Sequence, residues 1–382
     1  MVMKTTSILL SLIAMLTLTN RPVDGAETQR FFVGTYTGKD GGQGIYTSRL
    51  DAATGSPEEP MLAMECVNPA FLALHPTKPY LYAVGEAQKG MLRAFLYSEK
   101  SGRLVPHDEK EVPGQGPCHL ALCLSKDGET DAVVVANYSS GNVVSFPILG
   151  SGKIGKVASD ISHIGSGPNA MRQKGPHAHG AYFDGEMVAV PDLGIDQVIY
   201  YNMDLPTAKL SRSLEIANLR CPPGSGPRHL AASDDRRFVY VANELDSTVS
   251  VFDRRSPKYP NLLQTVATLP EDADATELKN STAEIELHPN GRFLYVSNRG
   301  HDSIAVFAVD QGRLTLIQNA PSGGKTPRFF CLDPTGRFLL ACNQDTGNIC
   351  VFAIDPSTGR LTPTEHGIDV PKPVCIVFAT TP

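Results

Sequence analysis

Apolar and polar positions follow a pattern that recurs along this chain. Each copy has an apolar run, a polar turn, a second apolar run that ends near Asn, another polar turn and a third apolar run. The clearest copies lie at 226–253, 281–310 and 326–355. Inside them, a run such as Val249-Ser250-Val251-Phe252 alternates with the period of two that is typical of a strand. Several short strands repeated about every 45–55 residues predict a β-propeller, in which each copy forms one blade.

Seven copies can be marked, because the second apolar run of each ends in a short anchor. The anchors are GTY (34–36), VGE (84–86), ANY (136–138), PDL (191–193), ANE (242–244), SNR (297–299) and CNQ (342–344). The first copy lacks its first strand, and a matching segment, PKPVCIVF (371–378), stands at the other end of the chain. We therefore expect an all-β, seven-bladed β-propeller that is closed when the C-terminal strand pairs with the N-terminal strands. Such closure leaves no open sheet edge.

The first residues differ from the rest of the chain. Lys4 precedes an apolar run at 7–19, and small residues follow around Gly25 and Ala26. This order predicts a secretory signal peptide at 1–25, since the run is short for a membrane span. An uncleaved membrane anchor is the alternative. We expect residues 26–382 to form a single propeller domain that is exported to the periplasm or the cell exterior, or stays cytoplasmic if the segment is not used.

The charge of the chain limits the kinds of binding partner that we expect, and its cysteine spacing bears on disulfide formation. The net charge is −6, and no basic run suggests nucleic acid. We expect no membrane contact beyond export, and a monomer or homodimer. The eight cysteines include no CxxC pair, so buried small hydrophobes are the simplest interpretation. A bridge between Cys342 and Cys350, or between Cys331 and Cys342, is the alternative.

Polar residues gather where first and second strands are expected to meet, at one mouth of the central channel. The strand starts supply Cys118, His119, His177, His179, Arg228, His229, Glu284 and Arg328, and the strand ends supply Glu86, Asn137, Asp192, Glu244, Arg299 and Gln344. Some have a structural alternative: His119 and His229 share a register, as structural hydrogen-bonding residues do. His177 and His179 alternate along an expected strand and so face one side. They could form a metal pair, but no third ligand completes a zinc set, so we expect no metal.

Several motifs together resemble a known family over about 30–378. They are GTYTG (34–38), GIYTSRLDAATG (44–55), NPAFLALHP (68–76), PHAHG (176–180), VPDLGIDQVIYY (190–201), GPRHL (226–230) and YVANE (240–244). In order and spacing the chain resembles the lactonase family of seven-bladed propellers, which includes bacterial 6-phosphogluconolactonases and the fungal carboxymuconate cycloisomerase. The resemblance implies a catalytic His, two Arg and a Glu, which fall at His177 or His179, Arg228, Arg299 and Glu244. His119, Asp192, His229 and Arg328 are then expected to bind substrate.

The resemblance implies a carboxylic ester hydrolase of carbohydrate metabolism that acts on a small anionic sugar-acid lactone, foremost 6-phospho-D-glucono-1,5-lactone. A neutral His would activate water, and the arginines would stabilise the oxyanion or hold the anionic group. No GxSxG motif suggests an acyl-enzyme, and no cofactor is expected. Two alternatives stay open: a muconate-type lactonising cycloisomerase, and a non-catalytic periplasmic binding module.

Overall fold

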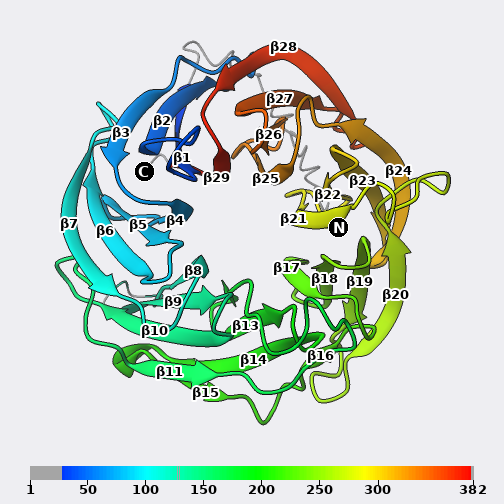
Figure 1. Cartoon of the computed structure of the whole chain (residues 1–382), viewed down its shortest axis with the longest axis horizontal. Helices are drawn as coiled ribbons and strands as arrows, with labels where there is room; N and C mark the ends of the chain where they lie inside the picture. Colours follow the sequence, from blue (N-terminus) through cyan, green and yellow to red (C-terminus); the bar gives the residue numbers. More distant parts are fainter. Residues whose placement is uncertain (1–27, 127, 129, 380–382) are drawn as a thin grey trace, which may run out of the picture.

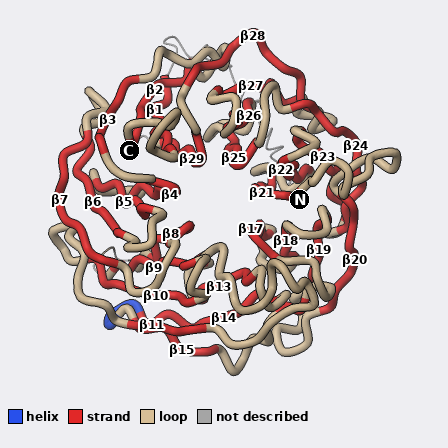
Figure 2. Tube along the Cα trace, in the orientation of Figure 1, coloured by secondary structure: helices blue, strands red, loops and turns tan. Residues whose placement is uncertain are grey.

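The computed structural model describes residues 28–126, 128 and 130–379, so the predicted signal peptide at 1–25 lies outside the described residues. Seven antiparallel sheets stand in a ring, with their inner strands around its centre (Figure 1). The expected all-β, seven-bladed propeller is confirmed. Figure 2 shows almost only strand and loop, and the described residues contain one short helix, the 3₁₀ turn η1 (Leu205–Thr207). No helix in this part of the chain is long and apolar enough to cross a bilayer.

Each blade places its first strand beside the channel and its last strand at the rim. The first blade contains β29 (Pro373–Phe378), β1 (Thr28–Thr35), β2 (Gly44–Asp51) and β3 (Met61–Glu65). The second contains β4 (Pro69–Leu74), β5 (Tyr80–Gly85), β6 (Met91–Tyr97) and β7 (Leu104–Glu111), and the third β8 (Pro117–Cys123), β9 (Asp131–Asn137), β10 (Asn142–Ile148) and β11 (Ser159–Ser162). The fourth contains β12 (Tyr182–Phe183), β13 (Met187–Asp192), β14 (Gln197–Asp204), β15 (Lys209–Arg212) and β16 (Leu219–Arg220).

The last three blades repeat the regular four-stranded pattern. The fifth contains β17 (Pro227–Ala232), β18 (Phe238–Asn243), β19 (Thr248–Asp253) and β20 (Asn261–Ala267). The sixth contains β21 (Ser281–Leu287), β22 (Phe293–Arg299), β23 (Ser303–Asp310) and β24 (Arg313–Pro321). The seventh contains β25 (Pro327–Leu332), β26 (Phe338–Asn343), β27 (Asn348–Ile354) and β28 (Leu361–Asp369).

The two ends of the described chain close the ring within one blade. Strand β29 pairs antiparallel with β1, and Val377 stands opposite Phe32 and Ile376 opposite Val33. The predicted closure is therefore confirmed. The interlocked strands lie in the core: Ile376 is 3 % exposed, and the Phe31 and Phe378 rings are 5.4 Å apart. Closure leaves the inner edge of β1 paired instead of open.

Local sequence fixes the turns that set the strand register. Between β25 and β26, Gly336 has φ +69°, in the left-handed region that favours glycine, and its N–H donates to the Asp333 carbonyl at 2.8 Å. The Asp333 carboxylate accepts from the backbone N–H of Phe338 at 2.7 Å. The Pro-Thr-Gly motif thus forms the predicted hairpin turn.

Apolar side chains from facing sheets fill the space between blades, and tyrosines lock neighbouring blades together. The hydroxyl of Tyr82 in β5 donates to the Gly152 carbonyl of the third blade, and Tyr295 in β22 donates to Gly359 of the seventh. All eight cysteines are free thiols. Cys331 and Cys342 lie in the apolar core, so the small-hydrophobe interpretation holds and the alternative disulfides do not form.

Candidate active site

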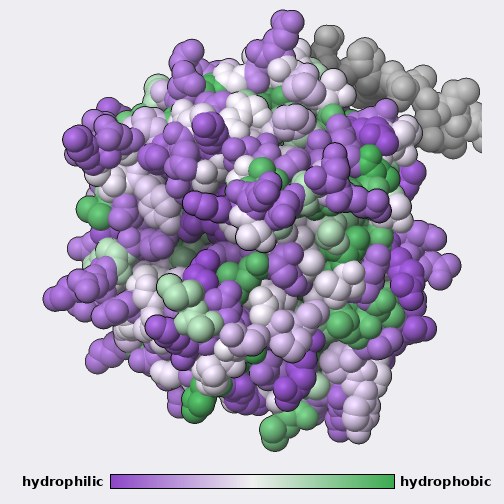
Figure 3. All heavy atoms as spheres, turned by 45° about the vertical axis from the view of Figure 1, so that its right-hand side comes forward, coloured by the Kyte–Doolittle hydropathy of each residue, from purple (hydrophilic) through white to green (hydrophobic). Residues whose placement is uncertain are grey.

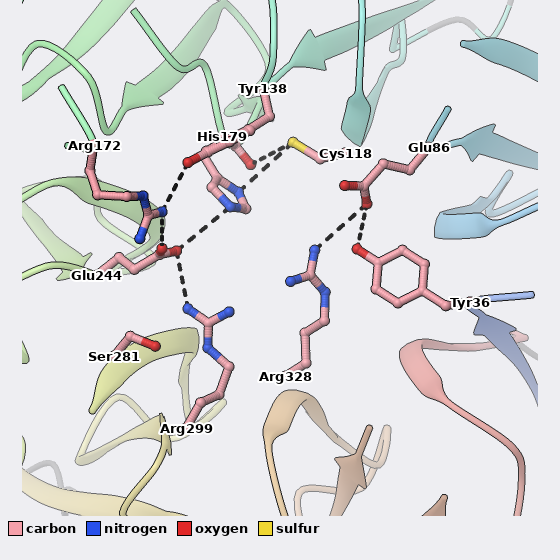
Figure 4. A pocket seen from close by; sticks show the side chains of 10 residues that line it. All are labelled: Tyr36, Glu86, Cys118, Tyr138, Arg172, His179, Glu244, Ser281, Arg299 and Arg328. Carbon is pink, nitrogen blue, oxygen red and sulfur yellow. Dashed lines mark hydrogen bonds and ion pairs between the residues drawn. The ribbon is translucent and has the colours of Figure 1, made fainter. Parts of the chain in front are cut away.

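A polar cavity of about 310 Å³ opens at one end of the channel. Each of the seven blades, or a loop at its edge, contributes to its wall, and Figure 4 shows the lining side chains around the open centre. The lining residues are Tyr36, Glu86, Cys118, Tyr138, Arg172, His179, Glu244, Ser281, Arg299 and Arg328. Four of them, His179, Glu244, Arg299 and Arg328, are residues that the sequence predicted for the site. They lie together although as many as 149 residues separate His179 from Arg328.

β-Bulges at the starts of inner strands aim side chains at this end of the channel. In β8, β17 and β25 the strand register shifts at the residue that follows the initial proline, which leaves Cys118, Arg228 and Arg328 unpaired in the ladder. A bulge bends the strand and re-aims the extra residue. Cys118 and Arg328 consequently line the cavity, and Arg228 lies directly behind Glu244.

The residues after the bulges form a second layer, deeper in the channel. His119 and His229 lie there with ring centroids 5.1 Å apart, and His119 packs at 3.8 Å on Phe71. Nδ1 of His229 is 2.9 Å from Oε2 of Glu284. Neither His119 nor His229 lines the polar cavity. Burial is the largest factor that holds the pKa of both imidazoles well below the ordinary histidine value.

Glu244 is the centre of the cluster because three guanidinium groups converge on its carboxylate. Oε1 accepts a 2.6 Å hydrogen bond from Nη2 of Arg172. Oε2 lies 3.2 Å from Nε of Arg228 and 3.1 Å from Nη2 of Arg299. Burial alone would raise the pKa of this carboxyl, but the positive charges of Arg299, Arg228 and Arg172 outweigh it and lower the pKa to about 2. Glu244 is thus a permanent anion that holds three arginines in place.

Arg172 comes from the long segment 163–181 between β11 and β12. Gln173 anchors it: this residue is fully buried, and its amide donates to the Leu193 carbonyl and to Oδ1 of Asp196 at 2.8 and 2.7 Å. The anchored turn presents Arg172 to both Glu244 and the Tyr138 hydroxyl, the latter at 2.9 Å. Sequence reasoning missed Arg172, because it lies outside the repeated pattern.

His179 is the imidazole that faces the cavity. Its Nε2 is 3.8 Å from Oε2 of Glu244, too far for a direct hydrogen bond, and its Nδ1 is 3.9 Å from Sγ of Cys118. Burial, followed by the charge of Arg228, holds the pKa of His179 well below its ordinary value. Burial also raises the pKa of the Cys118 thiol to about 12. The wall therefore presents a neutral imidazole beside an un-ionised thiol.

His177 lies next to this wall without lining it. Its ring stacks on Tyr138 at 4.6 Å, and Nδ1 is 2.8 Å from the Tyr138 carbonyl oxygen. The segment around it is not the strand that alternation predicted: it makes one bridge, Ala178 to Asp192, and the inner strand β12 begins only at Tyr182. Asp192 is fully buried, accepting from the His177 backbone and lying 2.6 Å from Nδ1 of His163, so it too stands away from the cavity.

The opposite wall of the cavity holds Arg328, Glu86 and Tyr36. Nη2 of Arg328 is 3.7 Å from Oε2 of Glu86, and its guanidinium carbon is 5.2 Å from the Tyr36 ring centroid. The Tyr36 hydroxyl donates a 2.6 Å hydrogen bond to the same oxygen of Glu86. Glu86 was placed at the channel mouth by the repeat but was given no role in catalysis or binding, and Tyr36 was not predicted, although both stand in anchors of the repeat. Position in the anchor was the signal that could have identified them.

The cluster carries excess positive charge. Arg172, Arg299 and Arg328 line the cavity and Arg228 lies behind it, so four guanidinium groups face the two carboxylates of Glu86 and Glu244. The excess is two positive charges, a field that favours an anion or a developing oxyanion. Among the described residues, no three His, Cys, Asp or Glu side chains gather as a metal-binding group.

Comparison with known proteins agrees with this architecture. A family model described as lactonase, 7-bladed beta-propeller, matches residues 30–378. The chain belongs to this lactonase family. A 6-phosphogluconolactonase of Bacillus subtilis is 37 % identical over 354 residues, covering 91 % of this chain and 97 % of the relative. A 6-phosphogluconolactonase of Formosa agariphila is 32 % identical over 315 residues, covering 79 % of this chain and 86 % of the relative.

A solved member of the lactonase fold comes from Pseudomonas aeruginosa, where it is named a periplasmic gluconolactonase. It superposes with a TM-score of 0.84 at 31 % identity, and the match covers 93 % of this chain and all of that structure. The ring of blades is therefore shared with a solved protein whose name gives a different substrate from the names of the two curated relatives.

Proposed function

We propose that this chain is a 6-phosphogluconolactonase-like lactonase, a carboxylic ester hydrolase that opens the lactone of a sugar acid with water. One observation carries the proposal: a neutral imidazole, His179, stands on the wall of a small cavity within 3.8 Å of Glu244, which three arginines surround. The family and the names of its relatives support the same reaction. Water, a base and fixed positive charge are what lactone hydrolysis requires.

In this mechanism His179 is the general base. With the proton on Nδ1, beside Cys118, the Nε2 lone pair removes a proton from water as the water oxygen bonds to the lactone carbonyl carbon. The imidazolium then returns the proton to the ring oxygen as the C–O bond breaks. The product is the open hydroxy acid, and His179 is neutral again.

Arg299 is the best placed donor to the oxyanion. Its Nη2 donates to the Thr282 carbonyl at 2.9 Å and forms an ion pair with Glu244. Its Nη1 donates to no residue in the described part of the chain. Burial lowers the pKa of Arg299 to about 10, so it stays charged near neutral pH. Glu244 and the buried Arg228 position this guanidinium, and Arg328 contacts the remainder of the substrate.

A hydrolysis assay tests this proposal. The purified protein is given D-glucono-1,5-lactone and, separately, 6-phospho-D-glucono-1,5-lactone generated in situ, and acid release is corrected for spontaneous opening. We expect a kcat/KM of at least about 10⁴ M⁻¹s⁻¹ on one of them. Replacing the base, His179→Asn, should lower it roughly 100-fold, whereas His366→Asn on the outer strand β28 should not. Rates no higher than spontaneous opening of both lactones would refute the function.

We also propose that the protein is exported, with residues 26–382 as one mature domain. The order of charged, apolar and small residues at 1–26 supports it, as does the family member that is named periplasmic. N-terminal sequencing of protein from the source cell should begin near Ala26 or Glu27. A soluble protein that retains Met1 would contradict export.

A further inference from the structure

The cavity has two halves that differ in charge. Around Glu244, three guanidinium groups face one carboxylate, which leaves the whole excess of two positive charges on that half. On the other half a single guanidinium, that of Arg328, faces the single carboxylate of Glu86. This far half is therefore neutral, and Figure 4 shows that the two halves stand on opposite sides of the open centre.

The lactone carbonyl must lie in the charged half, because His179 and Arg299 are there. The substituents on the far side of the lactone ring then meet Arg328, Glu86 and Tyr36. The charge of the far half, and not that of the whole cavity, consequently decides which substituent is accepted.

Arg328 has unused donors in this half. It makes no hydrogen bond to any described residue, since its contact with Glu86 at 3.7 Å is too long for one. Yet its side chain is only 16 % exposed. Arg172 and Arg299, by comparison, each donate a hydrogen bond to a neighbour. A guanidinium presents five N–H donors, so Arg328 is held in place with its donors available to a ligand.

Glu86 supplies acceptors next to those donors. Its Oε2 accepts from Tyr36, and its Oε1 accepts from no side chain or backbone N–H in the described part of the chain. A sugar hydroxyl can accept from Arg328 and donate to Glu86 at the same time, because a hydroxyl is both donor and acceptor. A phosphate dianion offers only acceptor oxygens and negative charge, so the Glu86 carboxylate repels it.

We infer that the Glu86–Arg328 pair recognises the hydroxyl groups of an unphosphorylated polyhydroxy lactone and selects against its phosphorylated counterpart. The inference rests on the proposed lactonase function and narrows its substrate class to neutral aldonolactones. Glu86 is the specificity-determining residue, and Tyr36 fixes its orientation through the 2.6 Å hydrogen bond.

The test compares kcat/KM for D-glucono-1,5-lactone with kcat/KM for its 6-phosphate in the full protein and two variants. The wild type should favour the unphosphorylated lactone at least about tenfold. Glu86→Gln keeps an acceptor for Tyr36 but loses the negative charge, and should move the ratio at least about tenfold toward the 6-phosphate. The matched control, Glu111→Gln, removes a carboxylate from an exposed site in the same blade and should leave the ratio unchanged.

The outcomes separate the inference from the proposed function. Hydrolysis of both lactones with preference for the 6-phosphate would overturn the inference and leave the lactonase function in place. A kcat/KM ratio for the two lactones that is unchanged in Glu86→Gln would also overturn the inference and leave the lactonase function in place. If Glu86→Gln does not fold, the preference of the wild type between the two lactones still decides whether the inference holds. Hydrolysis of neither lactone would refute the proposed function itself.

Discussion

Nη2 of Arg172 donates a 2.6 Å hydrogen bond to Oε1 of Glu244. This bond joins the irregular segment between the third and fourth blades to the residue that follows β18 in the fifth. It also explains much of the electrostatics of the site: together with Arg299 and Arg228, Arg172 overcomes the effect of burial and lowers the pKa of Glu244 to about 2. The carboxylate therefore stays ionised over any pH at which the protein is expected to act.

Removing Arg172 should weaken catalysis more than stability. Its side chain is 42 % exposed, so Arg172→Met exposes little new surface. Glu244 loses one of three cations, and the remaining guanidinium groups are drawn toward it and away from the cavity. We expect kcat/KM to fall roughly 10- to 100-fold, with a melting temperature close to that of the wild type. Arg220→Met, an exposed arginine outside the site, is the control. An unchanged kcat/KM would show that Arg172 is dispensable.

Arg172 also shows which part of the site could not be predicted from the sequence. Repeats predicted the blades, their number and the closure of the ring, because each blade obeys the same alternation of strands and turns. The repeats also predicted that Glu244, Arg299 and Arg328 lie at one mouth of the channel, since anchors and strand starts meet there. Arg172 belongs to no repeat, and its position depends on long-range contacts of the buried Gln173. No local pattern encodes that placement.

The bulges explain why His119 and His229 lie one layer below the cavity. Alternation alone cannot tell which of two successive residues after the initial proline turns to the mouth. The extra residue of the β8 and β25 bulges, Cys118 or Arg328, lines the cavity. The residue after the bulge in β8 and β17, His119 or His229, lies in the channel below. The histidines that were expected to bind substrate pack instead against aromatic rings.

The two histidines of the PHAH motif should behave differently when replaced. His179→Asn should lower kcat roughly 100-fold, because the cavity loses its base. His177→Asn should change kcat/KM less than about threefold, yet lower the free energy of unfolding by about 1 kcal/mol, since the stacking on Tyr138 is lost. Kinetics and urea unfolding of both variants measure the difference. A larger kinetic loss in His177→Asn would reverse the assignment of the base.

The pH profile of kcat/KM should report the buried imidazole. His179 acts as a base only when neutral, so the rate should rise as the pH increases through its pKa and then level off. Because burial and Arg228 hold that pKa well below the ordinary value, the rise should be complete by about pH 6.5. Stopped-flow rates corrected for spontaneous opening measure this. A rise that continues well above pH 6.5 would mean that His179 is not buried in the neutral form.

The C-terminal strand should be indispensable to the fold. Strand β29 supplies the inner strand of the first blade, and its Cys375 and Ile376 lie in the core. Deleting residues 371–382 removes these contacts and exposes the inner edge of β1, so we expect an aggregating protein without a cooperative melting transition. Deleting only 380–382 is the control. A truncated protein that melts like the wild type would contradict closure by β29.

Two further carboxyl groups stand in the deeper part of the channel. Glu284 and Glu286 are two residues apart on β21 and line a second cavity of about 490 Å³ with Phe71 and Phe329. Burial raises the pKa of both to about 8. A carboxyl with a folded pKa above its unfolded value of 4.5 stabilises the protein fully below that value. This contribution disappears as the pH rises toward 8.

Replacing Glu286 should therefore remove part of the pH dependence of stability. In Glu286→Gln the amide oxygen can still accept the Leu332 N–H that Oε2 accepts at 2.8 Å, but no proton is lost at high pH. Because Glu286 is partly exposed, we expect the free energy of unfolding at pH 8.5 to rise only by about 1 kcal/mol. At pH 4.5 the variant should match the wild type. Urea unfolding at both pH values measures this, with the exposed Glu277→Gln as control. A variant that is less stable at pH 8.5 would mean that the ionised carboxylate is favoured in the folded protein.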